Sequence, residues 1–314
     1  MSLGIALSPF TLDATDHAVD AAVAAGRQAA AAGLSSLWFG HTFSHDSIVL
    51  SAVVGREVPE LEVGTSAVPI SARHPLLIAS QAQTAQAATH GRFALGLALG
   101  TAAFTEPVFG VTFDRPIARL REFLTALRSV LDTGTVDFHG ETLTAVAPLP
   151  AAVAGAKPTV PVLVAAMGPQ ALRVTGELAD GTLPFLVGPK ALAEQIVAPI
   201  TKAAERAGRS APRIVAMVPG VVTADIEGAR AAAEESTAFY NDIPSYQRII
   251  ELSGASRAAE LVVIGDEQTI ADRVAEYFEA GATDVVFAQT DLTTPADEQR
   301  TWQLLGELNR SAQQ

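Results

Sequence analysis

Short apolar runs alternate with longer alanine-rich segments along almost the whole chain. The apolar runs carry few polar interruptions, which is typical of strands buried on both faces of a parallel sheet. The alanine-rich segments are long enough for helices, and glycines such as Gly33, Gly208 and Gly281 follow them, where a left-handed cap suits glycine. The predicted strands are Leu3–Leu7, Ser36–Phe39, Leu61–Ser66, Phe93–Leu97, Val160–Ala165, Gly181–Phe185, Arg213–Pro219 and Val285–Ala288.

A predicted helix accompanies each strand, and the order of about eight strand–helix pairs favours a closed parallel barrel over an open sheet. The fold class expected is therefore α/β, as a (β/α)8 or TIM barrel. The predicted helices are Asp16–Ala32, Ser47–Gly55, Pro75–Thr89, Ile117–Leu131, Gln170–Leu178, Leu192–Ala207, Asp225–Ser236, Ile270–Ala280 and Glu298–Leu308.

Two segments lie outside this alternation. Thr133–Pro161, after the fourth strand, holds a predicted hairpin followed by a loop rich in proline, alanine and glycine. Tyr240–Glu260 follows the seventh strand. Insertions of this length on a barrel are lids, substrate walls or plain surface excursions. No low-complexity linker divides the chain, so residues 1–314 are expected to form a single domain.

The amino-acid composition limits which partners and which cellular compartment are expected. Acidic residues outnumber basic ones, 34 to 21, for a net charge of −13, which disfavours binding to nucleic acid. The chain has no cysteine, which excludes disulfides, thiolate zinc sites and a cysteine nucleophile. It shows neither a secretory signal nor an apolar run long enough for a membrane span. A cytoplasmic protein without membrane contact is therefore expected.

Small residues stand at several strand ends, where a flat ligand can lie against backbone. The strand ending at Ala165–Ala166 runs into a helix that opens at Gly168–Pro169. Free N–H groups and the helix dipole at such a start bind phosphate without a basic side chain. An ordinary tight turn is the alternative interpretation. Ser66–Ala67 and Ala98–Gly100, at two other strand ends, complete a possible ligand shelf.

A histidine follows the second strand, at the barrel end where catalytic groups gather. His41 is interpreted either as a catalytic or ligand-contacting group or as an ordinary loop histidine. With His45 it lacks a third metal ligand, so no metal site is expected. Arg73 suits an anionic ligand, a salt bridge or a helix cap, and Glu106 is the nearest carboxylate for proton transfer.

Taken together, these segments resemble the luciferase-like monooxygenase superfamily, and within it the actinobacterial oxidoreductases that depend on the deazaflavin coenzyme F420. The order and spacing of the matching segments extend over nearly the whole chain. The segments are Gly64–Pro69, Arg73–Pro75, Gly91–Leu97, Arg115–Pro116, Arg121–Glu122, Val162–Arg173, Gly176–Thr182, Ala207–Arg213, Ile243–Tyr246 and Ala280–Asp284.

The resemblance implies a cofactor site on the carboxyl rim of the barrel. The ring is expected beside a bulge after the third strand with a cis peptide at Ser66–Ala67, and its phosphate at the start of the helix after the fifth strand. Many relatives have Asp-His where this chain has Gly40-His41, and a glutamate or histidine where it has Thr101. Thr101 donates a hydrogen bond but is a poorer proton source. The expected cofactor-binding residues are Gly40, Thr65, Ser66, Ala67, Ala98, Gly100, Thr101, Ala166, Met167, Gly168 and Pro169, with His41 as the catalytic residue.

The implied function is an F420-dependent oxidoreductase that moves a hydride between C5 of the deazaflavin and a small organic substrate. The alternatives are an FMN-dependent monooxygenase supplied by a separate reductase, and a flavin-binding protein without catalysis. Relatives commonly pair through helices beside the early strands, so a homodimer is expected through segments 21–32 and 75–89.

Overall fold

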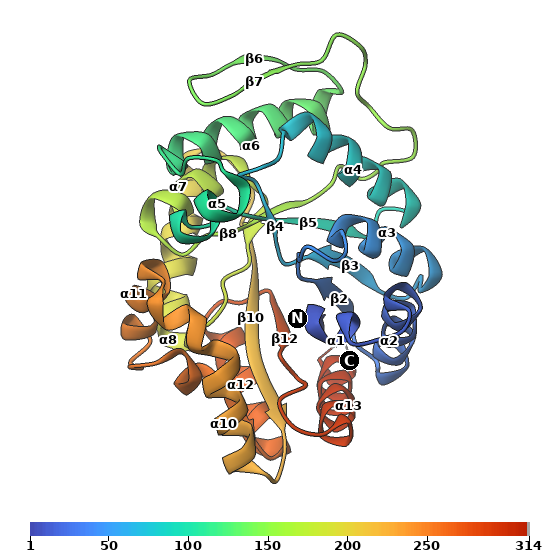
Figure 1. Cartoon of the computed structure of the whole chain (residues 1–314), viewed down its shortest axis with the longest axis vertical. Coiled ribbons are helices and arrows are strands. Elements are labelled where there is room, and N and C mark those ends of the chain that lie inside the picture. The colour runs from blue at the N-terminus through green and yellow to red at the C-terminus, as the bar shows by residue number, and fades with distance from the viewer. Residues whose placement is uncertain (313–314) are drawn as a thin grey trace. The chain divides into compact units, whose positions relative to one another are not determined.

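The structure, a computed structural model, describes residues 1–312. Contacts divide the chain into two compact units, which are described separately. The first comprises Met1–Trp38, Leu183–Pro199 and Arg213–Gln314, and the second comprises Phe39–Thr182 and Ile200–Pro212. Both units contain parallel strands that alternate with helices (Figure 1). The predicted α/β class is confirmed.

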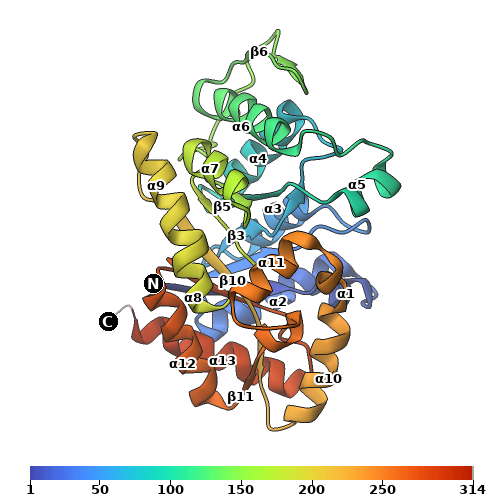
Figure 2. The same cartoon turned by 90° about the vertical axis from the view of Figure 1, so that its left-hand side faces the viewer.

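The first unit is built on four parallel strands in the order β11, β10, β12, β1. Helices α10, α12 and α13 contact these strands (Figure 2). Ile5, Val285 and Phe287 are fully buried, as expected for strands covered on both faces. The elements of this unit are β1 (Ser2–Leu7), α1 (Pro9–Asp13), α2 (Ala18–Ala32), α8 (Pro189–Ala191), a π-helical turn (Leu192–Val197), β10 (Arg213–Val222), α10 (Ile226–Thr237), a 3-10 turn (Ala238–Asp242), α11 (Pro244–Leu252), a second 3-10 turn (Ala258–Leu261), β11 (Val263–Gly265), α12 (Glu267–Glu279), β12 (Asp284–Ala288) and α13 (Pro295–Ser311).

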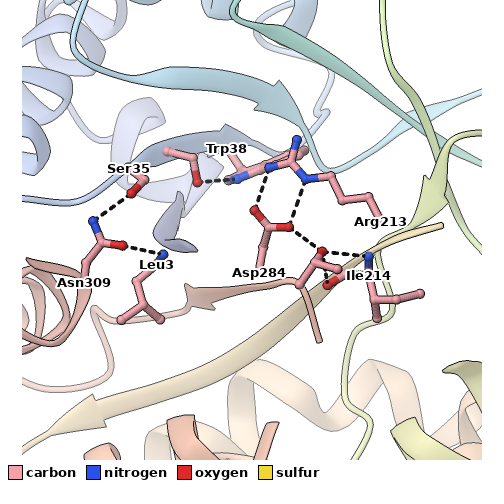
Figure 3. A network of polar contacts seen from close by, with 9 residues as sticks. Leu3, Ser35, Trp38, Arg213, Ile214, Asp284 and Asn309 are labelled. Atoms are coloured by element: carbon pink, nitrogen blue, oxygen red, sulfur yellow. Dashed lines mark hydrogen bonds and ion pairs between the residues drawn. The ribbon is translucent and has the colours of Figure 1, made fainter. Parts of the chain in front are cut away.

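A polar network closes the amino ends of these strands (Figure 3). Arg213, at the start of β10, donates from Nε and Nη2 to the two carboxylate oxygens of Asp284, at 2.9 and 2.7 Å. The same guanidinium lies over the Trp38 ring, 5.8 Å from its centroid. Asp284 is buried, so this two-pronged ion pair compensates a charge removed from water. Contacts at the amino ends of barrel strands serve stability rather than chemistry.

Asn309 of α13 ties the chain's first strand to the turn that precedes its second. Its Oδ1 accepts from the Leu3 amide at 3.0 Å, and its Nδ2 donates to Ser35 Oγ at 2.7 Å. The amide of Asn309 also donates to the Gly33 carbonyl, at 2.9 Å. The last helix is therefore fixed to the sheet by a buried side chain that satisfies three polar groups at once.

The second unit is built on parallel strands in the order β3, β5, β8, β9, with the short β4 pairing further along β5. Val63, Leu95 and Leu163, one from each of three neighbouring strands, are fully buried. Strand β2 (Ser36–Phe39) ends where this unit begins, and α9 (Ala198–Arg206) ends within it. The other elements are α3 (Ser47–Glu57), β3 (Glu62–Thr65), β4 (Val68–Pro69), α4 (Pro75–Ala88), β5 (Phe93–Ala98), α5 (Ala102–Phe109), α6 (Pro116–Thr133), β6 (Asp137–His139), β7 (Thr144–Val146), β8 (Val162–Ala165), α7 (Pro169–Leu178) and β9 (Gly181–Thr182).

The predicted hairpin is present as β6 and β7, which lie beside α6 (Figure 1). Glu122 of α6 holds its turn: the carboxylate accepts from the amides of Glu141, Thr142 and Leu143 at 2.8–3.1 Å. Burial raises the pKa of Glu122, but these bonds and one from the Thr142 hydroxyl outweigh it, and the pKa is lowered. The insertion is therefore anchored to the barrel helix that precedes it.

Several helices, α1, α5, α8 and α11 among them, form where the sequence pattern predicts none. Helix α5 contains Pro107 and buries only Thr105, so neither helix propensity nor a buried stripe marks it in the sequence. Helix α11 lies in the second insertion and buries Ile249 and Ile250. Strand β11, which follows that insertion, was also not predicted. None of the helices within residues 1–312 combines the length and the apolar character needed to cross a membrane.

Candidate functional site

The carboxyl ends of β3, β5 and β8 lie along one edge of the sheet of the second unit. Pairing is parallel throughout, with Val63 opposite Phe93 and Leu97 opposite Val164. Neighbouring strands in a sheet lie about 4.8 Å apart, so β3 and β8 are about two such spacings from each other. The segments that follow these three strands hold most of the predicted cofactor residues, and the fold therefore brings them together.

The segment after β3 is fixed to its neighbours through backbone and side chain. The Thr65 hydroxyl is buried and exchanges two bonds of 2.9 Å with the backbone of Gly96, so this side chain joins β3 to β5. The Ser66 amide donates to the Phe39 carbonyl at the end of β2, at 2.8 Å. The Ser66–Ala67 peptide is cis, as the resemblance implies. Ser66 and Ala67 are half-buried, which leaves this turn partly accessible.

The segment after β5 contains an unsatisfied hydroxyl. Gly100 has φ +81°, and a Cβ at this position would lie 3.0 Å from Thr105 Oγ1 and 3.3 Å from Ser71 Oγ. The next residue, Thr101, is the N-cap of helix α5, but its side chain makes no capping bond. Within the described chain Thr101 Oγ1 is buried and has no hydrogen-bond partner. Such orphaned groups are uncommon and point to a missing partner.

Side-chain hydrogen bonds fix the end of β8, whereas the start of α7 at Gly168 faces open space. The Thr182 hydroxyl donates to the Val164 carbonyl at 2.7 Å and lies 3.3 Å from the Ala166 carbonyl, which fixes the end of β8. Ala166 is buried, Met167 and Gly168 are half-buried, and Pro169 is exposed. A Cβ built on Gly168 meets no atom within 4 Å. Since the first amides of a helix lack intrahelical partners, this end of α7 presents free donors to open space.

His41 sits after β2 in contact with a cation. Its Nε2 lies 3.0 Å from Arg73 Nη2, and its Nδ1 lies 3.4 Å from Ser47 Oγ. Because a guanidinium only donates, Nε2 accepts this bond and the imidazole is neutral. Burial and then the Arg73 charge lower the pKa of His41, against a smaller opposing effect of Asp46. Gly40, the half-buried residue before it, contributes no side chain.

Arg73 makes the salt bridge that was one of its sequence interpretations. Its Nη1 lies 3.5 Å from Asp46 Oδ2, and Asp46 also caps α3 by accepting from the Ile48 amide at 2.9 Å. His41, Arg73 and Asp46 therefore form one cluster whose net charge is zero while the imidazole is neutral. Glu106 instead accepts from the Phe113 amide at 3.0 Å, so it holds a loop and stands as a weak candidate for proton transfer.

Sequence reasoning missed three aromatic residues on the segments that carry His41 and Thr101. Phe43, Phe104 and Phe109 lie with ring centroids 6.0–6.1 Å apart in every pair. Phe43 follows His41 by two positions and Phe104 follows Thr101 by three, so the nearness of aromatics to both candidates was the available signal. Within residues 1–312, no group of three or more His, Asp or Glu side chains is placed to hold a metal ion.

Comparison with known proteins identifies the family of this chain. The sequence matches the luciferase-like monooxygenase family over residues 1–284. It is 30% identical over 250 residues to the uncharacterized protein Rv1360 of Mycobacterium tuberculosis, covering 76% of this chain and 72% of that protein. It is 26% identical over 170 residues to Rv3520c of the same organism, named as a proposed coenzyme F420-dependent oxidoreductase, covering 51% of this chain and 49% of that one.

The fold has solved counterparts. The coenzyme F420-dependent tetrahydromethanopterin reductase of Methanopyrus kandleri superposes with a TM-score of 0.76 at 21% identity, covering 99% of both chains. This likeness confirms the predicted (β/α)8 barrel. The family match extends over far more than half of the chain, and the chain belongs to the luciferase-like monooxygenase family.

Proposed function

We propose that this protein is a coenzyme F420-dependent oxidoreductase that acts on a small organic substrate. The observation that carries the proposal is the arrangement at one sheet edge of the second unit. There, the open start of α7 at Gly168, the half-buried Ser66–Ala67 turn and the unpartnered Thr101 hydroxyl all follow parallel strands. The relative Rv3520c, named for F420 dependence, favours the deazaflavin over FMN.

The residues present fit a phosphate-bearing planar cofactor. Amides of Met167, Gly168 and the first turn of α7 bind its anionic arm, and the positive end of the helix dipole adds to that attraction. Ala98, Gly100 and Ser66–Ala67 offer small side chains where a flat ring requires close approach. The Thr101 hydroxyl donates to the ring or to the substrate and so gains the partner that it lacks.

When bound, the deazaflavin supplies a two-electron hydride carrier at C5. The protein's part is to hold a carbonyl oxygen of the substrate near His41 and to neutralise the charge that grows there as the carbonyl carbon receives the hydride. Arg73 holds the His41 imidazole neutral and supplies a positive charge beside it. With its Nε2 occupied by Arg73, His41 would donate from Nδ1–H to the carbonyl oxygen and polarise it, and water would supply the proton that completes the alcohol.

Two measurements test the proposal. Fluorescence quenching gives the dissociation constants of F420 and of FMN with the purified protein, and F420 is expected to bind more tightly. Turnover of the reduced cofactor with organic carbonyl compounds is expected to fall about 10²- to 10⁴-fold in His41→Ala, with the dissociation constant of F420 unchanged. Full activity of His41→Ala rejects the assigned role of His41.

A second function has its own support. The family description is that of monooxygenases, and the open start of α7 suits FMN phosphate equally well. Tighter binding of FMN, with oxygen consumption when a reductase supplies reduced flavin, would establish this alternative. A flavin-binding protein without catalysis is the remaining alternative, and turnover of any substrate disposes of it.

The proposal includes a homodimer, a cytoplasmic location and a single domain over residues 1–314. In the second unit, α3 and α4 expose Val49, Val53 and Leu77, and the first two of these line a groove of about 430 Å³. Exposed apolar side chains on neighbouring helices are typical of an interface. Light scattering at micromolar concentration is expected to report a dimer, and a monomer would contradict this part of the proposal.

A further inference from the structure

The most exposed aromatic surface of the second unit lies on the segments that carry the candidate catalytic groups. Phe43 is 71% exposed and Phe104 is 38% exposed, and each contacts the other and Phe109. We call Phe43, Phe104 and Phe109 the phenylalanine cluster. Single exposed apolar residues are ordinary, but a group of aromatic rings gathered in the open marks a binding surface.

Helix α5 contributes little to the core of its unit. Its sequence from Ala102 to Phe109 has one charged residue, yet Thr105 is its only buried one within the described chain. The charged residue, Glu106, is engaged with the Phe113 amide. Glycines with positive φ, Gly100 and Gly110, stand at the two ends of this segment. An apolar helix that does not serve the core is available to something outside it.

The charged residues near the phenylalanine cluster limit the class of molecule that binds to it. Arg73 is paired with Asp46, and His41 is held neutral between Arg73 and Ser47. His41 and Arg73 therefore offer no uncompensated positive charge to a sugar phosphate or another anionic substrate, and Arg119 donates to the Ser71 and Thr142 carbonyls. A neutral molecule with a substantial apolar part complements this surface best.

We infer that the phenylalanine cluster binds the apolar body, alkyl or aryl, of a neutral organic substrate whose reactive oxygen lies toward His41 and Thr101. This inference rests on the proposed function and adds the substrate class to it. Phe43 and Phe104 act as specificity-determining residues. They pack against the apolar body, and their contact excludes water from the side of the substrate away from its polar end.

The inference is tested by binding, without turnover. Dissociation constants of 2-alkanones of increasing chain length are measured by calorimetry with the full chain, with and without F420. Because burial of one methylene group changes an affinity by up to about fourfold, binding to the wild type is expected to tighten about twofold to fourfold per methylene. Phe43→Ser with Phe104→Ser is expected to remove most of this dependence, whereas Phe43→Leu with Phe104→Leu keeps it.

Leu149→Ser is the matched control, since Leu149 is an exposed apolar residue of the same unit beyond the hairpin and outside the cluster. It is expected to leave the chain-length dependence unchanged, and circular dichroism establishes that each variant is folded. A wild type that binds all the alkanones equally, or a double serine variant with the wild-type dependence, overturns the inference.

Two other occupants are separate outcomes. If the affinity does not change with alkanone chain length and the double serine variant no longer forms a dimer, the phenylalanine cluster would be assigned to the interface between two copies of this chain. If the affinity does not change with chain length and the wild-type protein co-sediments with phosphatidylcholine vesicles, the phenylalanine cluster would be assigned to binding a lipid surface. Both outcomes overturn the inference. Chain-length dependence without F420 binding would instead reject the proposed function and leave the substrate surface standing.

Discussion

The Arg73 guanidinium lies 3.0 Å from Nε2 of His41, although 32 positions separate the two residues in the sequence. The contact places a permanent cation against the imidazole that is the leading catalytic candidate. It keeps that imidazole neutral and in one tautomer, with the remaining proton on Nδ1 facing Ser47. The chemistry proposed for His41 therefore depends on a partner supplied by the loop before α4.

The first prediction concerns the pKa of His41. In Arg73→Met the second largest of the three effects that lower this pKa is removed, after burial and ahead of His45, and the pKa is expected to rise toward its ordinary value. Titration of the His41 ring followed by NMR measures it. Arg56→Met is the control, because Arg56 contacts His90 at 2.9 Å in the same manner. An unchanged His41 titration in Arg73→Met would show that burial alone sets its pKa.

The pH dependence of stability has a definite sign. The folded pKa of His41 is depressed, so below the unfolded value of about 6.5 the unfolded chain binds more protons than the native one. The contribution of His41 is complete above about pH 6.5 and is lost as pH falls through the folded pKa. Urea unfolding at about pH 7.5 and about pH 5 should show a smaller difference for His41→Asn than for wild type. His139→Asn, at an exposed hairpin residue, should retain the wild-type difference.

Gly100 is expected to be irreplaceable by a larger residue. In Gly100→Ala the positive φ costs about 1–2 kcal/mol, and the new methyl group also crowds Thr105 and Ser71. Gly110→Ala is the control, since Gly110 has φ +65° with no atom within 4 Å of the built Cβ. Urea denaturation should show the larger loss for Gly100→Ala. Equal losses would mean that the crowding is relieved without cost.

Substitution of Arg213 is expected to lower stability, because the buried carboxylate of Asp284 is then left without its ion-pair partner. In Arg213→Met the buried charge of Asp284 loses its two-pronged partner, and the free energy of unfolding should fall by about 3–5 kcal/mol. Adding Asp284→Leu should recover part of this loss. Arg300→Met breaks an exposed pair with Glu267, which solvent screens, and should cost far less than Arg213→Met. A double variant less stable than Arg213→Met would contradict the argument.

The eight predicted strands and their helices are present in the structure. They could be predicted because buried strands have nearly continuous apolar sequences. Phe93–Leu97, for example, became β5 with one added residue. Glycines such as Gly33 fixed helix ends through their left-handed caps. Helix α5 could not be predicted because it has no buried face, and its sequence therefore shows no helical repeat of apolar residues. Irregular, exposed elements leave little apolar signal to detect.

The candidate site was predictable only in part. Strand ends bearing small residues identified Ser66–Ala67 and Gly168 because parallel strands deliver their carboxyl ends to one edge. The partners of His41 were not predictable, since Arg73 reaches it from the loop before α4 and Ser47 from the first turn of α3. The phenylalanine cluster likewise forms from β2 and β5 connections that only folding brings together. Contacts between loops depend on three-dimensional placement that no local pattern encodes.

The central claim is that the start of α7 at Gly168 holds the anionic arm of a deazaflavin. The test is the dissociation constant of F420 for wild type, Gly168→Asn and Gly168→Asp, measured by fluorescence quenching. The site has room for either side chain, and both residues are good helix caps, so both variants should fold. The account predicts near wild-type affinity for Gly168→Asn and affinity at least about tenfold weaker for Gly168→Asp, since only aspartate opposes a phosphate with charge. Equal affinities for all three proteins would contradict it.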